Sequence, residues 1–223
     1  GNYVLDKDFE HCKSFLARGL YIEDFESCIS IGTSKDMMRR AKTLSLRRIP
    51  KSLKNVIPDL RQSIDGGMNE LTCLALCDSD GMECVIGQSN PSQVGIISNL
   101  TYLTLTKVKH LKTLHSGQPP QGLFANLEEL SIDSCDSLEH ILTEDVKEIV
   151  DASDYQSYKN AFPKLKTLAI LKCKKLEYLM PISFAKSLTR LEALMITENN
   201  ELRSMFGPSS EDLNPNKPQI IEF

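Results

Sequence analysis

The chain contains no tryptophan, and aromatic residues make up only 6% of its 223 residues. Its core must therefore be filled mainly by aliphatic side chains. No run of apolar residues approaches the roughly 18 that a membrane-spanning helix needs. The amino end also lacks the charged-then-apolar order of a signal peptide. We therefore expect no membrane span.

The chain also lacks an excess of positive charge. It has 26 Lys and Arg residues against 30 Asp and Glu residues, which gives a formal net charge of −4. A surface that binds nucleic acid is basic, with its Lys and Arg side chains clustered. We therefore expect no nucleic-acid partner.

The short motifs that mark common catalytic sites are missing as well. The sequence has no G-x-x-x-x-G-K-[ST] phosphate loop, no G-x-S-x-G and no H-E-x-x-H. Cys73, Cys77 and Cys84 lie close together, but no second pair has matching spacing, and His110 and His115 lie well beyond them. We expect no metal site, no cofactor in this chain and no enzymatic activity.

Seven cysteines are an odd number, which argues against a complete disulfide framework. Free thiols are typical of a reducing compartment, so we expect a cytoplasmic or nuclear protein. One glycosylation sequon, Asn99-Leu100-Thr101, points the other way. Because Leu100 and Thr101 fall in a predicted strand, we expect the sequon not to be used.

The most informative stretch runs from Leu127 to Ile141. Its apolar residues are separated by steps of three, two, three, three and three, so neither a helix nor a strand holds one period throughout. The step of two is typical of a strand, and the steps of three suit a turn and a tight helical return. Such a unit exposes its apolar side unless another copy is stacked on it.

The chain contains copies of this unit. Their positions are Leu100, Leu103, Leu105, Val108, Leu111 and Leu114; Leu165, Leu168, Ile170, Cys173, Leu176 and Leu179; Leu191, Leu194, Ile196, Asn199, Leu202 and Met205; a weaker Leu71, Leu74, Leu76, Ser79, Met82 and Val85; and a first half, Ala41, Leu44, Leu46 and Ile49. The first strand leucines of the six copies are 30, 29, 27, 38 and 26 residues apart.

This pattern resembles the leucine-rich repeat. More narrowly, it resembles the repeat region of plant intracellular nucleotide-binding leucine-rich-repeat disease resistance proteins of the coiled-coil type. Three features carry that resemblance: Cys135 and Cys173 stand where many repeats have Asn, Phe124 and Phe162 each precede a repeat by three residues, and the connections are irregular in length.

The resemblance implies an α/β leucine-rich-repeat solenoid. It has a curved parallel sheet on its concave side, and loops with short helices or 3₁₀ turns on its convex side. We expect residues 1–40 to be an amino-terminal cap or degenerate repeat. Residues 41–223 would hold about six repeats, truncated at both ends, since the chain begins without Met and Phe223 resembles the start of a further repeat.

Several segments carry separate predictions. Residues 9–20 suit a short helix, residues 25–32 alternate like a strand, and Pro181 can start a helical turn. The apolar residues of the insert at residues 144–151 have helical spacing. The insert is either a binding element or a tolerated insertion. The basic residues between Arg39 and Arg48 form either a solvated edge or a contact to a neighbouring domain.

Alignment of the repeats also predicts side-chain contacts. Glu128 falls beside Lys166 and Asp136 beside Lys174, so opposite charges face each other across one repeat step. Cys135, Cys173 and Asn199 share one position after the strand, and the apolar setting favours a structural role for both thiols.

The outward strand residues predict a concave binding surface. The candidate partner-binding residues are Arg47, Tyr102, Thr104, Thr106, Glu129, Ser131, Asp133, Thr167, Leu171, Met195 and Thr197. The resemblance implies recognition of a pathogen effector or a modified host protein, and restraint of an adjoining nucleotide-binding domain. ATP or ADP would belong to that domain. Substrate recognition for a ubiquitin ligase and a scaffold role are the alternatives.

Overall fold

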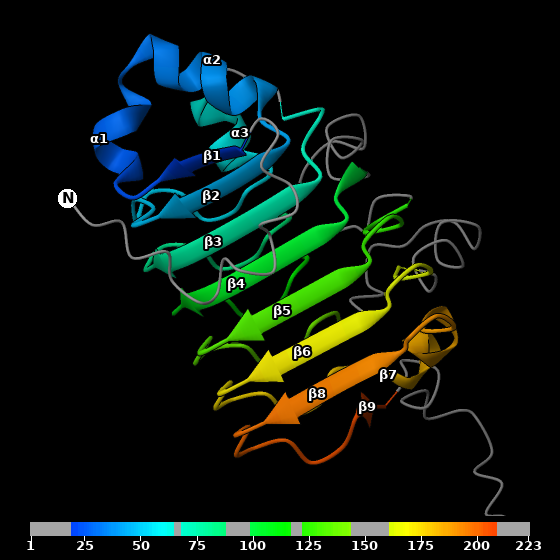
Figure 1. Cartoon of the computed structure of the whole chain (residues 1–223). Helices are drawn as coiled ribbons and strands as arrows, with labels where there is room; N and C mark the ends of the chain where they lie inside the picture. The colour runs from blue at the N-terminus through cyan, green and yellow to red at the C-terminus, as the bar shows by residue number, and fades with distance from the viewer. Residues whose placement is uncertain (1–18, 65–67, 88–98, 117–121, 144–160, 209–223) are drawn as a thin grey trace, which may run out of the picture.

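The computed structural model describes residues 19–64, 68–87, 99–116, 122–143 and 161–208. Seven strands form one all-parallel sheet in the order β1-β2-β3-β4-β5-β6-β8 (Figure 1). They are β1 Gly19–Ile22, β2 Thr43–Arg47, β3 Cys73–Ser79, β4 Tyr102–Val108, β5 Glu129–Asp133, β6 Thr167–Leu171 and β8 Ala193–Thr197. The predicted leucine-rich-repeat fold is confirmed.

The register of the sheet follows the leucines of the repeats. One residue from each strand lies in a single row across the sheet: Leu20, Leu44, Leu74, Leu103, Leu130, Leu168 and Leu194. From Leu44 onward this row contains the predicted first strand leucines, so the repeat alignment is confirmed. Leu20 adds a strand that the spacing did not reveal, because β1 has no second half of a repeat after it.

The segment after β1 is helical, and the predicted strand over residues 25–32 is wrong. Helices α1 Phe25–Ile29 and α2 Gly32–Arg40 occupy it. Asp24 caps α1 by accepting a hydrogen bond from the Ser27 N–H. Phe25 is fully buried, and so is Met38 of α2, so both helices are anchored to the core. Most of the helix predicted over residues 9–20 lies outside the described residues.

The described parts of the returning segments contain only short helices and strands. Helix α3 Asp59–Ser63 and the 3₁₀ helix η4 Ile182–Ser187 pack behind the sheet, and η4 follows Pro181 as predicted. Strands β7 Met180–Pro181 and β9 Phe206–Gly207 form a second small parallel sheet. The insert at residues 144–151 lies outside the described residues. Among the helices that are described, none has the length and apolar character needed to cross a membrane.

The core is one continuous cluster of the inward-facing repeat residues. Phe124 and Phe162, the aromatic residues that precede two neighbouring repeats, stack with ring centroids 5.5 Å apart and planes 8° from parallel. The core thus extends from repeat to repeat without a break.

A left-handed residue lies at the carboxyl end of each of the six repeat strands from β2 to β8, either as the last residue but one of the strand (β3 and β4) or directly after it. Their φ angles lie between 50° and 57°, and the residues are Arg48, Asp78, Lys107, Ser134, Lys172 and Glu198. At three of these turns the N–H donates to a carbonyl of the next strand, as from Ser134 to Leu171 and from Lys172 to Thr197. The backbone bonds of the next repeat therefore hold a conformation that residues other than glycine rarely adopt.

This turn gives a test of the fold. Replacing Lys172 by Val should lower the free energy of unfolding by about 1 kcal/mol, because a β-branched residue fits the left-handed region poorly. Replacing Lys172 by Gly should not lower it. Urea unfolding of both variants measures the difference. Lys175→Val, at an exposed site without positive φ, is the control, and equal effects of Val and Gly at 172 would contradict the account.

Candidate functional site

The two faces of the sheet differ in chemistry. On β5, Leu130 and Ile132 are buried in the core, whereas Glu129, Ser131 and Asp133 point to the opposite face and are partly exposed. We call this second face the concave face.

On β4 to β8 the concave face has three rows, each crossing the sheet from strand to strand. The first row is Tyr102, Glu129, Thr167 and Ala193; the second is Thr104, Ser131, Ala169 and Met195; the third is Thr106, Asp133, Leu171 and Thr197. The structure therefore brings ten of the eleven predicted site residues onto four neighbouring strands, and only Arg47 lies elsewhere, on β2.

Exposure rises along the sheet towards β8. On β2 and β3 the concave positions Thr43, Ser45, Cys73 and Ala75 are buried. The concave residues of β5 and β6 are partly exposed, and those of β8 are exposed, with Met195 at 55%. The accessible part of the concave face is therefore β4 to β8.

Thr106 differs from the other predicted site residues. It is only 7% exposed, although its row neighbour Asp133 is partly exposed. In the sheet it lies directly between Cys77 and Asp133, which flank it on the adjoining strands. Thr106 has little surface to offer a partner, so the prediction for this residue is corrected.

Arg47 is held by intramolecular contacts. Its Nε and Nη2 atoms both lie 2.9 Å from Oδ2 of Asp78. A hydrogen bond with Tyr21 and the Asp78 carboxylate raise the pKa of the guanidinium above its ordinary value. Sequence alone gave no signal for this pairing, because Asp78 belongs to the next repeat.

Other cations of the amino-terminal basic patch also have partners. Arg39 pairs with Asp36, and Arg48 pairs with Glu23 at 3.4 Å. Their charge is neutralised within the chain. This arrangement favours a solvated edge over a contact to a neighbouring domain.

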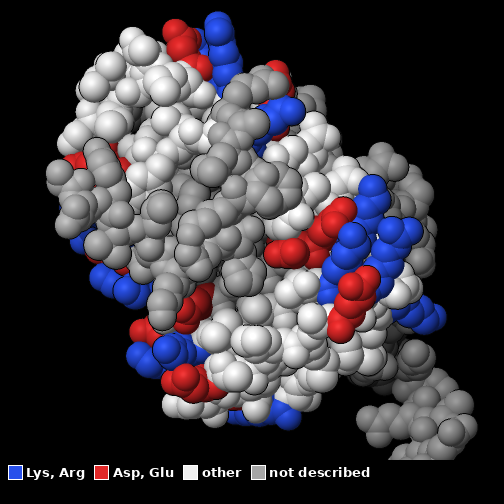
Figure 2. All heavy atoms as spheres, viewed as in Figure 1, with Lys and Arg blue, Asp and Glu red and all other residues white. Residues whose placement is uncertain are grey.

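The two predicted pairs between repeats are confirmed. Lys166 Nζ lies 2.7 Å from Glu128, and Lys174 Nζ lies 3.0 Å from Asp136. The Glu128 carboxylate raises the pKa of Lys166 through a hydrogen bond. Both pairs lie at the ends of the strands, and Figure 2 shows a largely uncharged surface between charged groups on its two sides.

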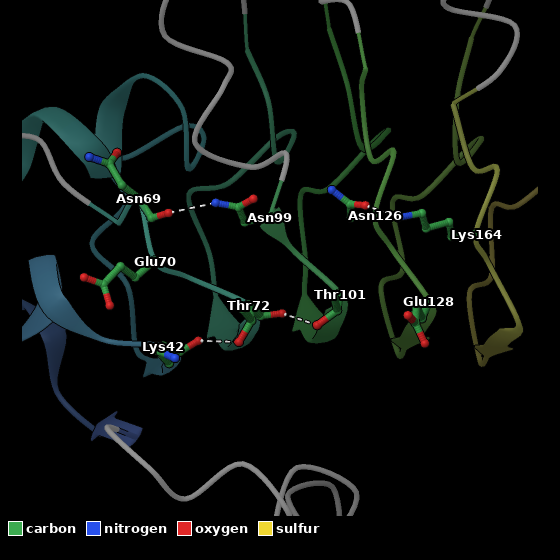
Figure 3. A pocket seen from close by; sticks show the side chains of 9 residues that line it. All are labelled: Lys42, Asn69, Glu70, Thr72, Asn99, Thr101, Asn126, Glu128 and Lys164. Carbon is green, nitrogen blue, oxygen red and sulfur yellow. Dashed lines mark hydrogen bonds between the residues drawn. The ribbon is translucent and has the colours of Figure 1, made fainter.

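A polar groove of about 430 Å³ crosses the amino ends of β2 to β5 (Figure 3). It is lined by Lys42, Asn69, Glu70, Thr72, Asn99, Thr101, Asn126, Glu128 and Lys164. The Asn99 amide donates to the Asn69 carbonyl, and Lys164 donates to the Asn126 side chain. These hydrogen bonds link successive repeats, so the groove is built from the contacts that hold the stack together. Asn99, the residue of the glycosylation sequon, is part of this ladder.

The position after the strand is structural, as predicted. Asn199 accepts a hydrogen bond from the Cys173 N–H and donates to the Ile170 and Thr197 carbonyls. Cys135 and Cys173 are fully buried, and each thiol donates to the carbonyl two residues before it. Burial raises the pKa of both thiols, that of Cys173 to about 11. In the described residues, no three His, Cys, Asp or Glu side chains are grouped so that they could hold a metal ion.

The comparison with protein families agrees with this geometry. Residues 144–200 match the model described as plant disease resistance protein RPS2-like, leucine-rich repeats. This part of the chain is therefore similar to the leucine-rich repeats of plant disease resistance proteins. Comparisons with curated proteins and with solved structures gave no match. Repeats of this family form a non-catalytic module that generally binds proteins.

The different burial of the cysteines predicts a clear order of thiol reactivity. At pH 8 to 9, Cys135 and Cys173 should resist iodoacetamide in the folded chain, because both are buried and their raised pKa keeps the thiols protonated. The partly exposed Cys77 should react. Peptide mass spectrometry measures each site, and guanidinium-unfolded protein is the control in which all three react. Labelling of folded Cys135 as fast as Cys77 would contradict the buried position.

The Glu128–Lys166 pair gives a second test. A double-mutant cycle with Glu128→Gln and Lys166→Gln should show a favourable coupling free energy between the two side chains. This coupling should disappear at about 1 M salt, because the pair is partly exposed to solvent. Thermal unfolding at two salt concentrations measures it. Glu128→Gln with Lys174→Gln is the control cycle, since Lys174 pairs with Asp136. Coupling that is absent at low salt, or unchanged by salt, would contradict the observed contact.

Proposed function

We propose that this chain is the protein-recognition module of a plant immune receptor. Its concave face would bind a pathogen effector or a host protein that a pathogen has modified. The observation that carries the proposal is the accessible concave face of β4 to β8, where polar, acidic and apolar side chains lie in register on four neighbouring strands.

The separation of core and surface supports this role. Leu168 and Ile170 of β6 are fully buried. The residues that alternate with them, Thr167, Ala169 and Leu171, lie on the concave face. Because the two sets point to opposite sides, the concave residues can change without disturbing the core. A recognition surface that must fit different partners benefits from this independence.

The second part of the proposal is restraint of an adjoining nucleotide-binding domain. RPS2, whose repeats define the matching family, combines a coiled coil, a nucleotide-binding domain and leucine-rich repeats. ATP or ADP would bind to that domain, and we expect no cofactor in this chain. The restraining contact would use concave residues, since three arginines of the amino-terminal patch, Arg39, Arg47 and Arg48, already pair within the chain.

We place the protein in the cytoplasm or nucleus. None of the six cysteines among the described residues forms a disulfide, and four of the repeat thiols are buried: Cys73, Cys84, Cys135 and Cys173. Free thiols of this kind suit a reducing compartment.

Substrate recognition for a ubiquitin ligase and a scaffold role make different predictions about the full-length protein. An F-box motif ahead of the repeats would favour the ligase, and a nucleotide-binding motif would favour the immune receptor. The family match to disease resistance repeats supports the receptor.

A pull-down with the nucleotide-binding domain of the same receptor tests the proposal. We expect the chain to retain that domain. Tyr102→Ala, Glu129→Ala or Asp133→Ala should weaken retention, by about tenfold or more for at least one of the three, as a central contact residue does. Melting temperatures of the variants measure folding separately.

Lys175→Ala, on the returning segment, is the matched control and should bind like the unchanged chain. Unchanged binding in all three concave variants would reject the concave face as the contact surface. Loss of binding in the Lys175 variant alone would move the contact to the convex side.

A further inference from the structure

The accessible concave face has an acidic part and an apolar part. The acidic part is Glu129 and Asp133 on β5. The apolar part is Ala169 and Leu171 on β6 with Ala193 and Met195 on β8. The concave positions of β4 to β8 carry no Lys or Arg at all.

Among the described residues, the two carboxylates of the acidic part have no cationic partner. In the described part of the chain, no Lys or Arg forms an ion pair with Glu129 or Asp133, although Glu128 and Asp136 close by each have one. Asp133 accepts a hydrogen bond of 2.9 Å from the Ser134 hydroxyl, which leaves its second oxygen for a ligand. This contrast shows where an incoming cation would find unneutralised charge.

The spacing of the carboxylates is set by the strand. Glu129 and Asp133 are four residues apart on one strand, so they lie about 13 Å from each other on the same face. Two basic side chains of one extended partner segment can reach both.

The apolar part lies beside the acidic part. Leu171 is the row neighbour of Asp133, and Met195 lies one strand further on and is 55% exposed. An exposed Met195 next to a partly exposed Leu171 favours an apolar contact from a partner. Neighbouring strands are about 4.8 Å apart, and Met195 lies one row, or two residues, along the strands from Leu171. A side chain seated between Leu171 and Met195 would therefore be about 8 Å from Asp133.

We propose that the concave face of β4 to β8 binds an extended protein segment in which an aliphatic or aromatic residue lies two or three positions from a Lys or Arg. The apolar side chain packs between Leu171 and Met195, and the basic side chain pairs with Asp133. Two or three residues of extended chain span about 7–10 Å, which matches this separation. A second basic residue pairs with Glu129. This inference rests on the proposed function, since it names the chemistry of the partner at the same surface.

Selection from a random peptide library tests the proposal directly. Peptides of about 12 residues displayed on phage are selected on the full 223-residue chain and sequenced. We expect enrichment of sequences with Lys or Arg two or three residues from a Leu, Ile, Met, Phe or Tyr. Enriched sequences without basic residues would overturn the proposal.

Variants of the chain then locate the binding site of an enriched peptide. E129Q/D133N should bind it roughly fivefold to thirtyfold more weakly, because two ion pairs are lost. Binding should also weaken as salt is raised. E139Q/E177Q is the matched control, since it removes the same charge from exposed positions on the returning segments, and its affinity should not change. Equal loss in both double variants would overturn the proposal.

The two proposals fail in different ways. If no peptide is enriched while the pull-down depends on concave residues, the segment proposal is wrong and the proposed function stands. If peptides are enriched as expected but concave substitutions do not change retention of the nucleotide-binding domain, the surface binds such segments but does not restrain that domain.

Discussion

Each repeat of this chain can cover its apolar side only with the repeats next to it. The parallel ladder between neighbouring strands sets that contact, because it places the strand leucines of every repeat in one row. Leu168 lies between two strands and is fully buried, whereas the equivalent Leu194 on the last strand of the sheet is 38% exposed. Burial of a leucine contributes about 1.5–3 kcal/mol, so the stack gains stability from each added neighbour.

The same ladder organises the surface. Since side chains alternate along a strand, the in-register leucines force the residues between them onto the opposite face, where they form rows. Charged pairs such as Glu128–Lys166 lie at the strand ends, and the left-handed turn that contains Lys172 redirects the chain after the strand. The core, the charged rim and the concave face therefore follow from one register.

The spacing of leucines was enough to predict six of the seven strands of the large sheet, β2 to β6 and β8, with their register and two ion pairs between repeats. These features depend on residues at equivalent positions of neighbouring units, which a sequence alignment of the chain with itself reveals. The repeat spacing also predicted that Cys135 lies in the core, and its thiol is fully buried in the structure.

The features that the sequence did not predict depend on contacts between residues that are not at equivalent positions of the repeat. Residues 25–29 alternate like a strand, but Asp24 caps a helix there and buried Phe25 anchors it. Arg47 looked available for a partner, yet it pairs with Asp78 from the next strand. The sequence likewise did not reveal that the first two concave positions of β2 and of β3 are buried, whereas the concave face becomes accessible from β4 onward.

The central claim is that the concave face, and not the returning side, contacts the protein partner. Site-specific photo-crosslinking tests it most directly. The photoreactive residue benzoylphenylalanine is placed either at Ala169, on the concave face of β6, or at Lys175, exposed on the returning side. The complex with the nucleotide-binding domain is then irradiated. The account predicts a crosslinked product from position 169 and none from position 175, and crosslinking from position 175 alone would contradict it.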